Sequence, residues 1–318
     1  MALARVDSFQ EWRARFGEQR LPTAMTIGNF DGVHLGHQQI LRRVVERAQK
    51  SNWMSAVLTF FPHPARVLRP EQAPPLLATL DQRLAAFGAA KIDAALVLNF
   101  DRELAQVTAE DFVQRYLVET MRAKTVLVGG SFRFGHRQAG DVNLLRELGT
   151  RWSFEVDVVP PVTIEGVAVS STAVREAVRD GRMEDARKLL GRPYALVGQI
   201  RPGTGQGRKL VVPTLNLAAE QELLPKMGVY ATQVALDGKV YRAATNVGVR
   251  PTFDGTRTTV ESHILDFSEN RASGSMEVRF CTRLRDEKKF SGPEALREQV
   301  LKDIERAREY FEAAKQVS

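Results

Sequence analysis

Several features that mark whole classes of proteins are missing from this 318-residue chain. Cys281 is the only cysteine, which excludes an internal disulfide and fits a reducing compartment. No run of about 18 apolar residues occurs, so the sequence predicts no membrane-spanning segment. The N-terminal segment carries Asp7 and Glu11 and lacks an apolar stretch, so we expect no signal peptide. These absences favour a globular cytoplasmic protein.

The charge balance is basic, with a formal net charge of +7 and a pI of about 9.7. Such a balance is typical of proteins that bind nucleic acid, membrane surfaces or small polyanions. No block of five or six like charges appears, and the basic residues are spread along the chain. A nucleotide phosphate explains this charge at least as well as RNA does, so both readings stay open at this point.

The N-terminal half alternates between two kinds of segment. Apolar runs predict strands over 23–28, 55–61, 94–100, 124–130 and 152–159. Between them, apolar residues at helical spacing predict a helix after the first strand, and Thr79 and Thr108 stand as N-caps of two more. This alternation predicts a parallel α/β sheet with helices on both faces.

The pattern changes near residue 190. Short strand-like runs over 194–200, 228–236, 239–247, 258–266 and 275–283 are separated by turns, which predicts an antiparallel β-barrel. Cys281 lies within such a run, where we expect a buried thiol. A helix from about residue 293 carries one apolar stripe that we expect to pack on the barrel, made of Leu296, Val300, Ile304, Ala307, Phe311 and Ala314. We place the boundary within 184–193, which gives domains of 1–186 and 187–318.

The segment "GNFDGVHLGHQQIL" (28–41) holds two of the five histidines, His34 and His37, on either side of Gly36. Metal ligands, bases and phosphate-binding groups are three readings of such a pair. Metal sites need three or four ligands, and helical pairs favour a spacing of four. Gly36 removes a side chain where a helix begins, and a helix N-terminus offers unpaired N–H groups to anions. The residues therefore favour binding of a nucleotide phosphate.

The same residues carry a resemblance. "GNFDGVHLGH" resembles the HxGH signature of class I nucleotidylyltransferases, and with "FDGVH" it is similar to the bacterial bifunctional riboflavin kinase/FMN adenylyltransferases. The resemblance implies that His34 and His37 stabilise the α-phosphate of ATP, with Gly28, Asn29, Phe30 and Gly36 around the phosphates. "SSTAVR" (170–175) resembles the second signature of these enzymes. It implies that Ser170, Ser171, Thr172 and Arg175 hold the leaving pyrophosphate.

Two further stretches resemble the flavin side of the family's adenylyltransferase domain. "FFPHP" (60–64) implies that Pro62 and His63 lie near the flavin, although His63 also fits a plain turn between two prolines. "VGGSFRFGHRQAGD" (128–141) resembles a loop in which Asp or Asn usually precedes the first Phe. Ser131 stands there in this chain, and a serine loses reach and charge. The departure puts the role of that side chain in doubt.

The C-terminal half resembles riboflavin kinases. In "PGTGQGRKLVVPTLNL" (202–217), Gly203, Gly205 and Gly207 suit a loop whose N–H groups face phosphates, and a flexible hairpin is the other reading. Val211 and Val212 replace the usual Gly and Phe, which predicts a stiffer loop. The resemblance to the PTxN motif implies that Thr214 and Asn216 hold a Mg²⁺–ATP complex. "VESHILDF" (260–267) implies that Glu261 is the general base, whereas Arg250 fits a flavin loop or a structural role.

Together these stretches predict an enzyme of FAD biosynthesis. The barrel would phosphorylate riboflavin to FMN, and the α/β domain would adenylylate FMN to FAD with release of pyrophosphate, both with ATP and Mg²⁺. A kinase with weakened or lost adenylyltransferase activity is the alternative, and a basic nucleotide- or RNA-binding protein is a third reading. We expect a cytoplasmic monomer or weak homo-oligomer with no nucleic-acid or membrane partner.

Overall fold

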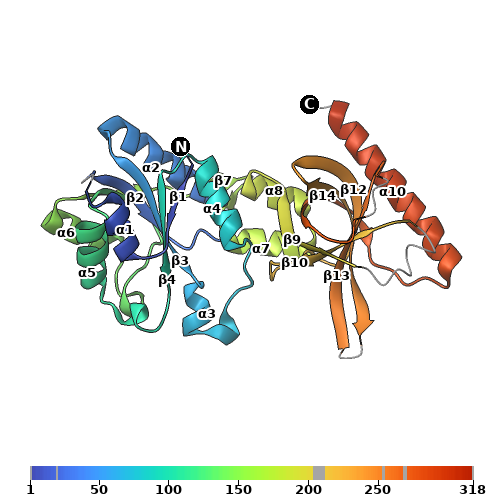
Figure 1. Ribbon diagram of the computed structural model, residues 1–318, viewed down its shortest axis with the longest axis horizontal. Helices are drawn as coiled ribbons and strands as arrows, with labels where there is room; N and C mark the ends of the chain where they lie inside the picture. Colours follow the sequence, from blue (N-terminus) through green and yellow to red (C-terminus); the bar gives the residue numbers. More distant parts are fainter. Residues whose placement is uncertain (1, 19–20, 203–211, 253–254, 268–270, 317–318) are drawn as a thin grey trace. The chain divides into compact units, whose positions relative to one another are not determined.

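The structure is a computed structural model that describes residues 2–18, 21–202, 212–252, 255–267 and 271–316. The chain forms two compact units, Met1–Ser170 and Ser171–Ser318 (Figure 1). This geometric division differs from the functional division predicted after residue 186, which stays a prediction.

The first unit is built on a six-stranded sheet in which every neighbouring pair of strands is parallel. In spatial order the strands are β1 (Ala4–Val6), β4 (Ala94–Asn99), β3 (Met54–Phe61), β2 (Thr23–Ile27), β5 (Ala123–Gly129) and β6 (Glu155–Val159). From β2 the chain builds outward to one side through β3 and β4, and then crosses to β5 on the other side. Ligands of parallel α/β sheets bind at the carboxyl ends of the strands where the order reverses. The loops after β2 and β5 meet at that point.

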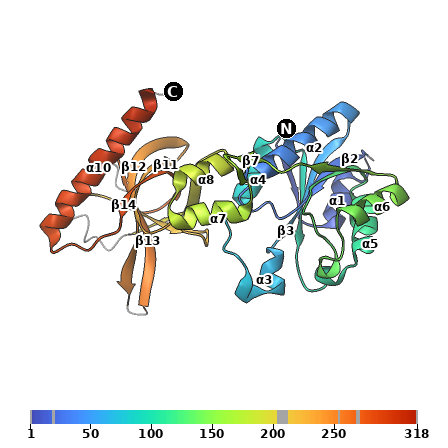
Figure 2. The same ribbon diagram turned by 180° about the vertical axis from the view of Figure 1, so that it is seen from behind.

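Helices cover both faces of this sheet, as the sequence predicts (Figures 1 and 2). One face is covered by α1 (Phe9–Phe16), α5 (Ala109–Phe112) with the π-helix η3 (Val113–Thr120), and α6 (Val142–Trp152). The other is covered by α2 (Leu35–Ser51) and α4 (Leu80–Ala89). The remaining elements are short: α3 (Pro64–Leu68), the 3₁₀ helices η1 (Pro70–Gln72), η2 (Leu104–Gln106) and η4 (His136–Gln138), and the hairpin of β7 (Thr163–Ile164) and β8 (Val167–Ala168).

The predicted helix starts are confirmed, and one predicted strand begins too early. The Thr79 hydroxyl accepts the N–H of Gln82 in a full capping box, and Thr108 caps α5. The predicted strand over 152–159 is wrong at its beginning, because α6 runs to Trp152 and β6 starts at Glu155. Asp141 caps α6 by accepting two backbone N–H groups, and this cap starts a helix that the strand pattern alone does not reveal.

The second unit contains the predicted antiparallel barrel, which closes on itself. Its strands, in spatial order, are β10 (Leu215–Ala219), β13 (Gly255–Ile264), β12 (Lys239–Thr252), β11 (Gly228–Leu236), β14 (Ser275–Asp286) and β9 (Tyr194–Arg201). Two helices precede it, α7 (Ser171–Asp180) and α8 (Met183–Leu190), and α8 contacts both β9 and β14. The predicted terminal helix is α10 (Pro293–Gln316).

The apolar stripe of α10 packs on the outer face of the barrel, as predicted for most of its length. Ile304, Ala307 and Phe311 are buried in a cluster that includes Cys281. Ala314 is exposed, so the predicted stripe ends one turn early, where the helix runs past the barrel strands. The predicted buried thiol is confirmed, and burial raises the pKa of Cys281 to about 11.

Candidate active sites

The loop after β2 occupies the reversal point of the parallel sheet. All five residues of β2 are buried, and the Gly28 N–H donates to the Leu58 carbonyl at 3.1 Å. The backbone then turns through the left-handed region at Phe30, Gly32 and Val33. A Cβ on Gly32 would lie 2.9 Å from the Leu77 side chain, so both the conformation and the space require glycine there.

His34 and His37 stand together at the start of α2. His34 is the N-cap, and its Nδ1 accepts the backbone N–H of His37 at 3.3 Å. The two rings are stacked with their centroids 3.7 Å apart and an interplanar angle of 18°. A Cβ on Gly36 would lie only 3.2 Å from two atoms of the His34 ring. The absence of a side chain at Gly36 therefore makes room for the His34 imidazole. That it also lets a ligand approach the backbone stays a prediction.

The surroundings of His37 favour its neutral form. Burial, and then the neighbouring His34, hold the pKa of His37 well below its ordinary value. Because Nδ1 of His34 accepts a hydrogen bond, the neutral ring carries its proton on Nε2. Nδ1 of His37 is buried with no hydrogen-bond partner among the described residues. The part of the chain that the structure describes holds no cluster of three or more His, Cys, Asp or Glu suited to a metal ion.

Two buried charged residues that the sequence did not single out hold this loop. The Asp31 carboxylate accepts the N–H groups of Leu77 and Ala78 at 3.0 and 3.2 Å, just before α4. From α4, Nη1 of Arg83 donates to the Asn29 carbonyl at 2.8 Å and to the Phe60 carbonyl at 3.3 Å. Burial lowers the pKa of Arg83, and the charge of Asp31 opposes that shift.

A sequence signal for Arg83 exists. It lies three residues after Leu80 and four before Phe87, so a cation occupies the apolar stripe of α4. A charge at such a position needs a buried partner, and the partners are the backbone of the loop after β2 and the end of β3.

A cavity of about 980 Å³ opens beside this loop at the carboxyl end of the sheet. Four of the predicted site residues line it: Gly28, Asn29, His63 and Ser131. Nδ1 of His63 accepts the Ala65 N–H at 3.1 Å, so this ring caps α3, and its place near the flavin stays a prediction. Five other predicted residues of this unit do not line the cavity: Phe30, His34, Gly36, His37 and Pro62. Two of them are close to it in sequence, because Pro62 directly precedes His63 and His34 lies five residues after Asn29.

The cavity wall combines aromatic rings with cations. Phenylalanines at 60, 100, 112, 132 and 134 and arginines at 69, 133 and 137 contribute to it. The Ser131 loop is fixed by a β-bridge between Phe134 and Gly140, and Nδ1 of His136 donates to the Ala105 carbonyl at 2.9 Å. Stacking surfaces beside positive charge suit a planar aromatic ligand that carries phosphate. The sequence did not predict these arginines or His136 as wall residues.

The second group of predicted residues lies on the outer face of the barrel. Residues directly opposite in antiparallel strands share a face, and the register pairs Asn216 with Glu261 and Glu261 with Asn246. These three side chains therefore form one row across β10, β13 and β12. The Thr259 hydroxyl donates to the Glu261 carboxylate at 3.1 Å. Asn246 is a member of this row that sequence reasoning missed, because only the strand register reveals it.

The remaining predicted residues fall in three positions. Thr214 is half-buried and lies two residues before Asn216. The carbonyl of the preceding Pro213 accepts a hydrogen bond from Nδ1 of His263 at 2.9 Å. Gly203, Gly205, Gly207 and Val211 lie outside the described residues, and Arg250 is placed on β12 by its backbone alone. Ser170 directly precedes α7, and Ser171, Thr172 and the buried Arg175 lie within that helix, in the second compact unit.

Comparison with protein families matches both halves of the chain. The FAD synthetase family model matches residues 17–173, and the riboflavin kinase model matches residues 190–311. The chain is 36% identical over 289 residues to a bifunctional riboflavin kinase/FMN adenylyltransferase of Haemophilus influenzae, with 91% of this chain and 94% of that protein covered.

The chain belongs to the bifunctional riboflavin kinase/FMN adenylyltransferase family. A member from Pseudomonas fluorescens is 38% identical, with 89% of this chain and 91% of that protein covered. A member from Escherichia coli K12 is 35% identical, with coverages of 90% and 92%.

A solved structure from Streptococcus pneumoniae, titled a macrolide-efflux protein, superposes with a TM-score of 0.84 and 28% identity. It covers 97% of this chain and 99% of its own. Within the residues that the structure describes here, no helix is both long and apolar enough to cross a membrane.

Proposed function

We propose that this chain converts riboflavin to FMN in its barrel and FMN to FAD in its parallel-sheet unit, with ATP as the donor in both steps. The observation that carries the proposal is the stacked His34–His37 pair at the start of α2, on the segment that follows the Gly28–Asn29 wall of a cavity lined by aromatic and cationic residues. The Asn216–Glu261–Asn246 row supports the kinase step.

In adenylyl transfer, a phosphate oxygen of FMN attacks the α-phosphorus of ATP while the bond to the β-phosphate oxygen breaks, and pyrophosphate leaves. The protein's task is positioning and charge stabilisation. The N-terminal N–H groups of α2 and the two imidazoles supply donors to the α-phosphate, where negative charge grows. His34 presents Nε2–H because its Nδ1 is engaged by the His37 N–H. Ser170, Ser171, Thr172 and Arg175 are proposed to hold the pyrophosphate.

In the kinase step, Glu261 accepts the proton of the ribityl 5′-hydroxyl as that oxygen attacks the γ-phosphorus and ADP leaves. The Thr259 hydroxyl orients the carboxylate. The Thr214 hydroxyl and the Asn216 amide oxygen are the hard oxygen donors that Mg²⁺ prefers, so they fit a Mg²⁺–ATP complex. Bound Mg²⁺ would neutralise phosphate charge.

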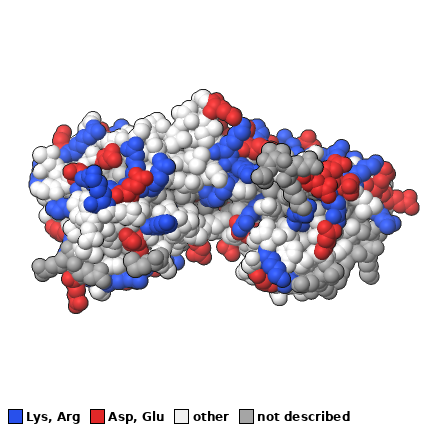
Figure 3. Space-filling model, turned by 90° about the horizontal axis from the view of Figure 1, so that it is seen from above, with Lys and Arg blue, Asp and Glu red and all other residues white. Residues whose placement is uncertain are grey.

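An RNA-binding function has less support than the enzymatic one. On the face drawn in Figure 3, Lys and Arg side chains are interspersed with Asp and Glu side chains. Such a mixture lacks the one-signed stripe along which a nucleic-acid backbone binds. We propose that the protein acts in the cytoplasm as a monomer or weak homo-oligomer, on small-molecule substrates alone.

A product assay with riboflavin, ATP and Mg²⁺ tests the proposal, with flavins separated chromatographically. We expect FMN and then FAD. His37→Ala should abolish FAD formation alone, and Glu261→Ala should abolish FMN formation while FAD still forms from supplied FMN. FMN without FAD in the unaltered protein would leave a kinase whose adenylyltransferase site, with Ser131 in its wall, has lost activity. Loss of both steps in both variants would contradict the two-site assignment.

A further inference from the structure

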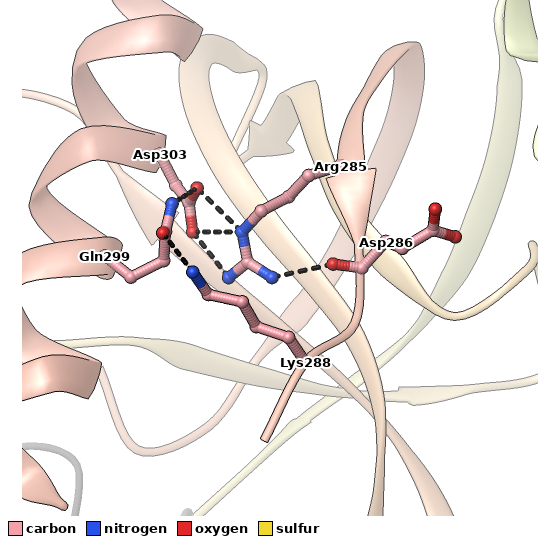
Figure 4. Close-up of polar contacts among 5 residues, drawn as sticks. All are labelled: Arg285, Asp286, Lys288, Gln299 and Asp303. Atoms are coloured by element: carbon pink, nitrogen blue, oxygen red, sulfur yellow. Dashed lines mark hydrogen bonds and ion pairs between the residues drawn. The ribbon is translucent and has the colours of Figure 1, made fainter. Parts of the chain in front are cut away.

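A buried ion pair joins α10 to the last barrel strand (Figure 4). Nε of Arg285, near the end of β14, lies 2.8 Å from Oδ1 of Asp303, and Nη2 lies 2.7 Å from Oδ2. The side chains are 15% and 4% exposed. This bidentate geometry fixes the direction of the Arg285 side chain, and with it the end of β14.

The contacts continue from this pair into the segment that connects β14 to α10. Gln299 of α10 donates to the Asp303 carboxylate at 2.9 Å and accepts from Nζ of Lys288 at 2.6 Å. Arg285 also donates to the Asp286 carbonyl at 2.8 Å. Residues 286 and 288, on either side of Glu287, are thus both held to this network (Figure 4).

Glu287 in turn lies over the row that carries the proposed base. A Cβ on Gly248 would lie 2.7 Å from Oε1 of Glu287 and 2.9 Å from Nδ2 of Asn246. The two polar groups therefore converge above a position without a side chain. Asn246 is the direct neighbour of Glu261 across the β12–β13 ladder. The connector between β14 and α10 (residues 287–292) thus brings a second carboxylate to the end of the Asn216–Glu261–Asn246 row.

We propose that the Arg285–Asp303 pair is a positioning device for the kinase site, and that it acts by holding Glu287 where its carboxylate binds the polyol chain of the flavin. This inference rests on the proposed kinase function. Riboflavin carries several ribityl hydroxyls, and an ionised carboxylate is an acceptor only. Glu287 accepts a hydrogen bond from one hydroxyl, while Glu261 takes the proton of another.

Stability alone is a weak reason for such a pair, because a buried ion pair adds little over apolar residues of similar volume. A second ion pair on the same helix provides the matched comparison. Arg308 of α10 binds Asp266 through two contacts, at 2.7 and 3.0 Å, without contacting the connector. This pair is more exposed than Arg285–Asp303, and breaking it removes a contact between α10 and Asp266 while the contacts of residues 286 and 288 stay in place.

The experiment compares four variants of the full chain: Asp303→Asn, Glu287→Gln, the double variant and Asp266→Asn. The initial rate of FMN formation is measured against riboflavin concentration at saturating ATP. We expect each of the first two to raise KM for riboflavin about tenfold, the size expected for the loss of one hydrogen bond to a charged group. The KM of the double variant should exceed the higher of the two single-variant KM values by no more than about twofold, because both substitutions remove the same interaction. Asp266→Asn should keep the KM of the unaltered protein, and FAD formation from supplied FMN should stay constant in all four.

Two results would overturn the inference: an unchanged KM in Glu287→Gln, or fully multiplicative effects in the double variant. Glu287 is exposed, so its substitution tests the proposal even where Asp303→Asn loses its cooperative thermal transition. In that case Asp303→Glu is used in place of Asp303→Asn, and its KM for riboflavin should lie between those of the unaltered protein and Glu287→Gln. Absence of FMN formation in the unaltered protein refutes the proposed function instead, which separates the two failures.

Discussion

A single methyl group on Gly36 should separate the stability of α2 from the chemistry at its N-terminus. In Gly36→Ala the added carbon would lie 3.2 Å from Cε1 and Nδ1 of His34, against ordinary contacts of about 3.5–4.0 Å. The ring must therefore move by roughly 0.3–0.8 Å. A shift of the ring alters its stack with His37, whose ring centroid is 3.7 Å away, and weakens the 3.3 Å cap hydrogen bond that Nδ1 accepts.

The energies of this change nearly cancel. Replacing glycine by alanine within a helix stabilises it by about 1 kcal/mol, and losing an N-cap bond costs about 1 kcal/mol. We therefore expect the thermal midpoint to shift by no more than about 3 °C. A displacement of this size in a positioned catalytic group lowers rates by roughly tenfold or more. FAD formation from FMN should fall by that factor, while FMN formation from riboflavin should not change.

Gly88→Ala is the matched control, because Gly88 also lies in a helix of the same unit. Its added carbon would meet only Cβ of Leu3, at an ordinary 3.7 Å. This variant should gain up to about 1 kcal/mol of stability and keep its full rate of FAD formation. A Gly36→Ala protein that forms FAD at the rate of the unaltered protein would refute the argument that His34 needs the empty space.

Three further predictions rest on buried groups. Arg83→Met should lower the free energy of unfolding, measured in urea, by about 3 kcal/mol, because Asp31 loses its compensating charge and the Asn29 carbonyl loses its donor. The rate of FAD formation should also fall, even under conditions where the variant is fully folded. The pKa of His37 is lowered in the folded state, so its contribution to stability is fully present above about pH 6.5 and is lost as the pH falls below that value, by at most about 1.4 kcal/mol per pH unit. His37→Gln should therefore lose less stability than the unaltered protein between pH 7 and 5.5, and equal losses would contradict the assignment. Burial raises the pKa of Cys281 to about 11, so a thiol reagent at pH 8 should label it only after unfolding; rapid labelling of the folded chain would show that the cluster under α10 opens.

The elements with strong local patterns could be predicted from the sequence. Strands β2 to β6 carry an apolar run of their own, the helices at Thr79 and Thr108 carry a cap, and α10 carries an apolar stripe. The three-residue β1 is too short to show a period, and both β1 and β10 form because neighbouring strands supply the ladder.

The sites divide in the same way. His34, His37, Asn216 and Glu261 belong to contiguous motifs, and motifs are visible along one chain. Asn246 depends on the register of two strands. The contact of Glu287 over Gly248 joins residues 39 positions apart, and no spacing rule connects them.

The membership of α7 and α8 in the barrel unit determines where the chain can be divided. The Lys226 N–H donates to the Val178 carbonyl of α7, and Gly181, between the two helices, leaves room for the Arg283 side chain. A fragment that begins at residue 187 starts inside α8 and removes this cover from β14. We therefore expect the smallest fragment that keeps the barrel unit folded to begin near residue 171. Such a fragment would carry Ser171 and Thr172, the serine and threonine proposed above to serve the other reaction.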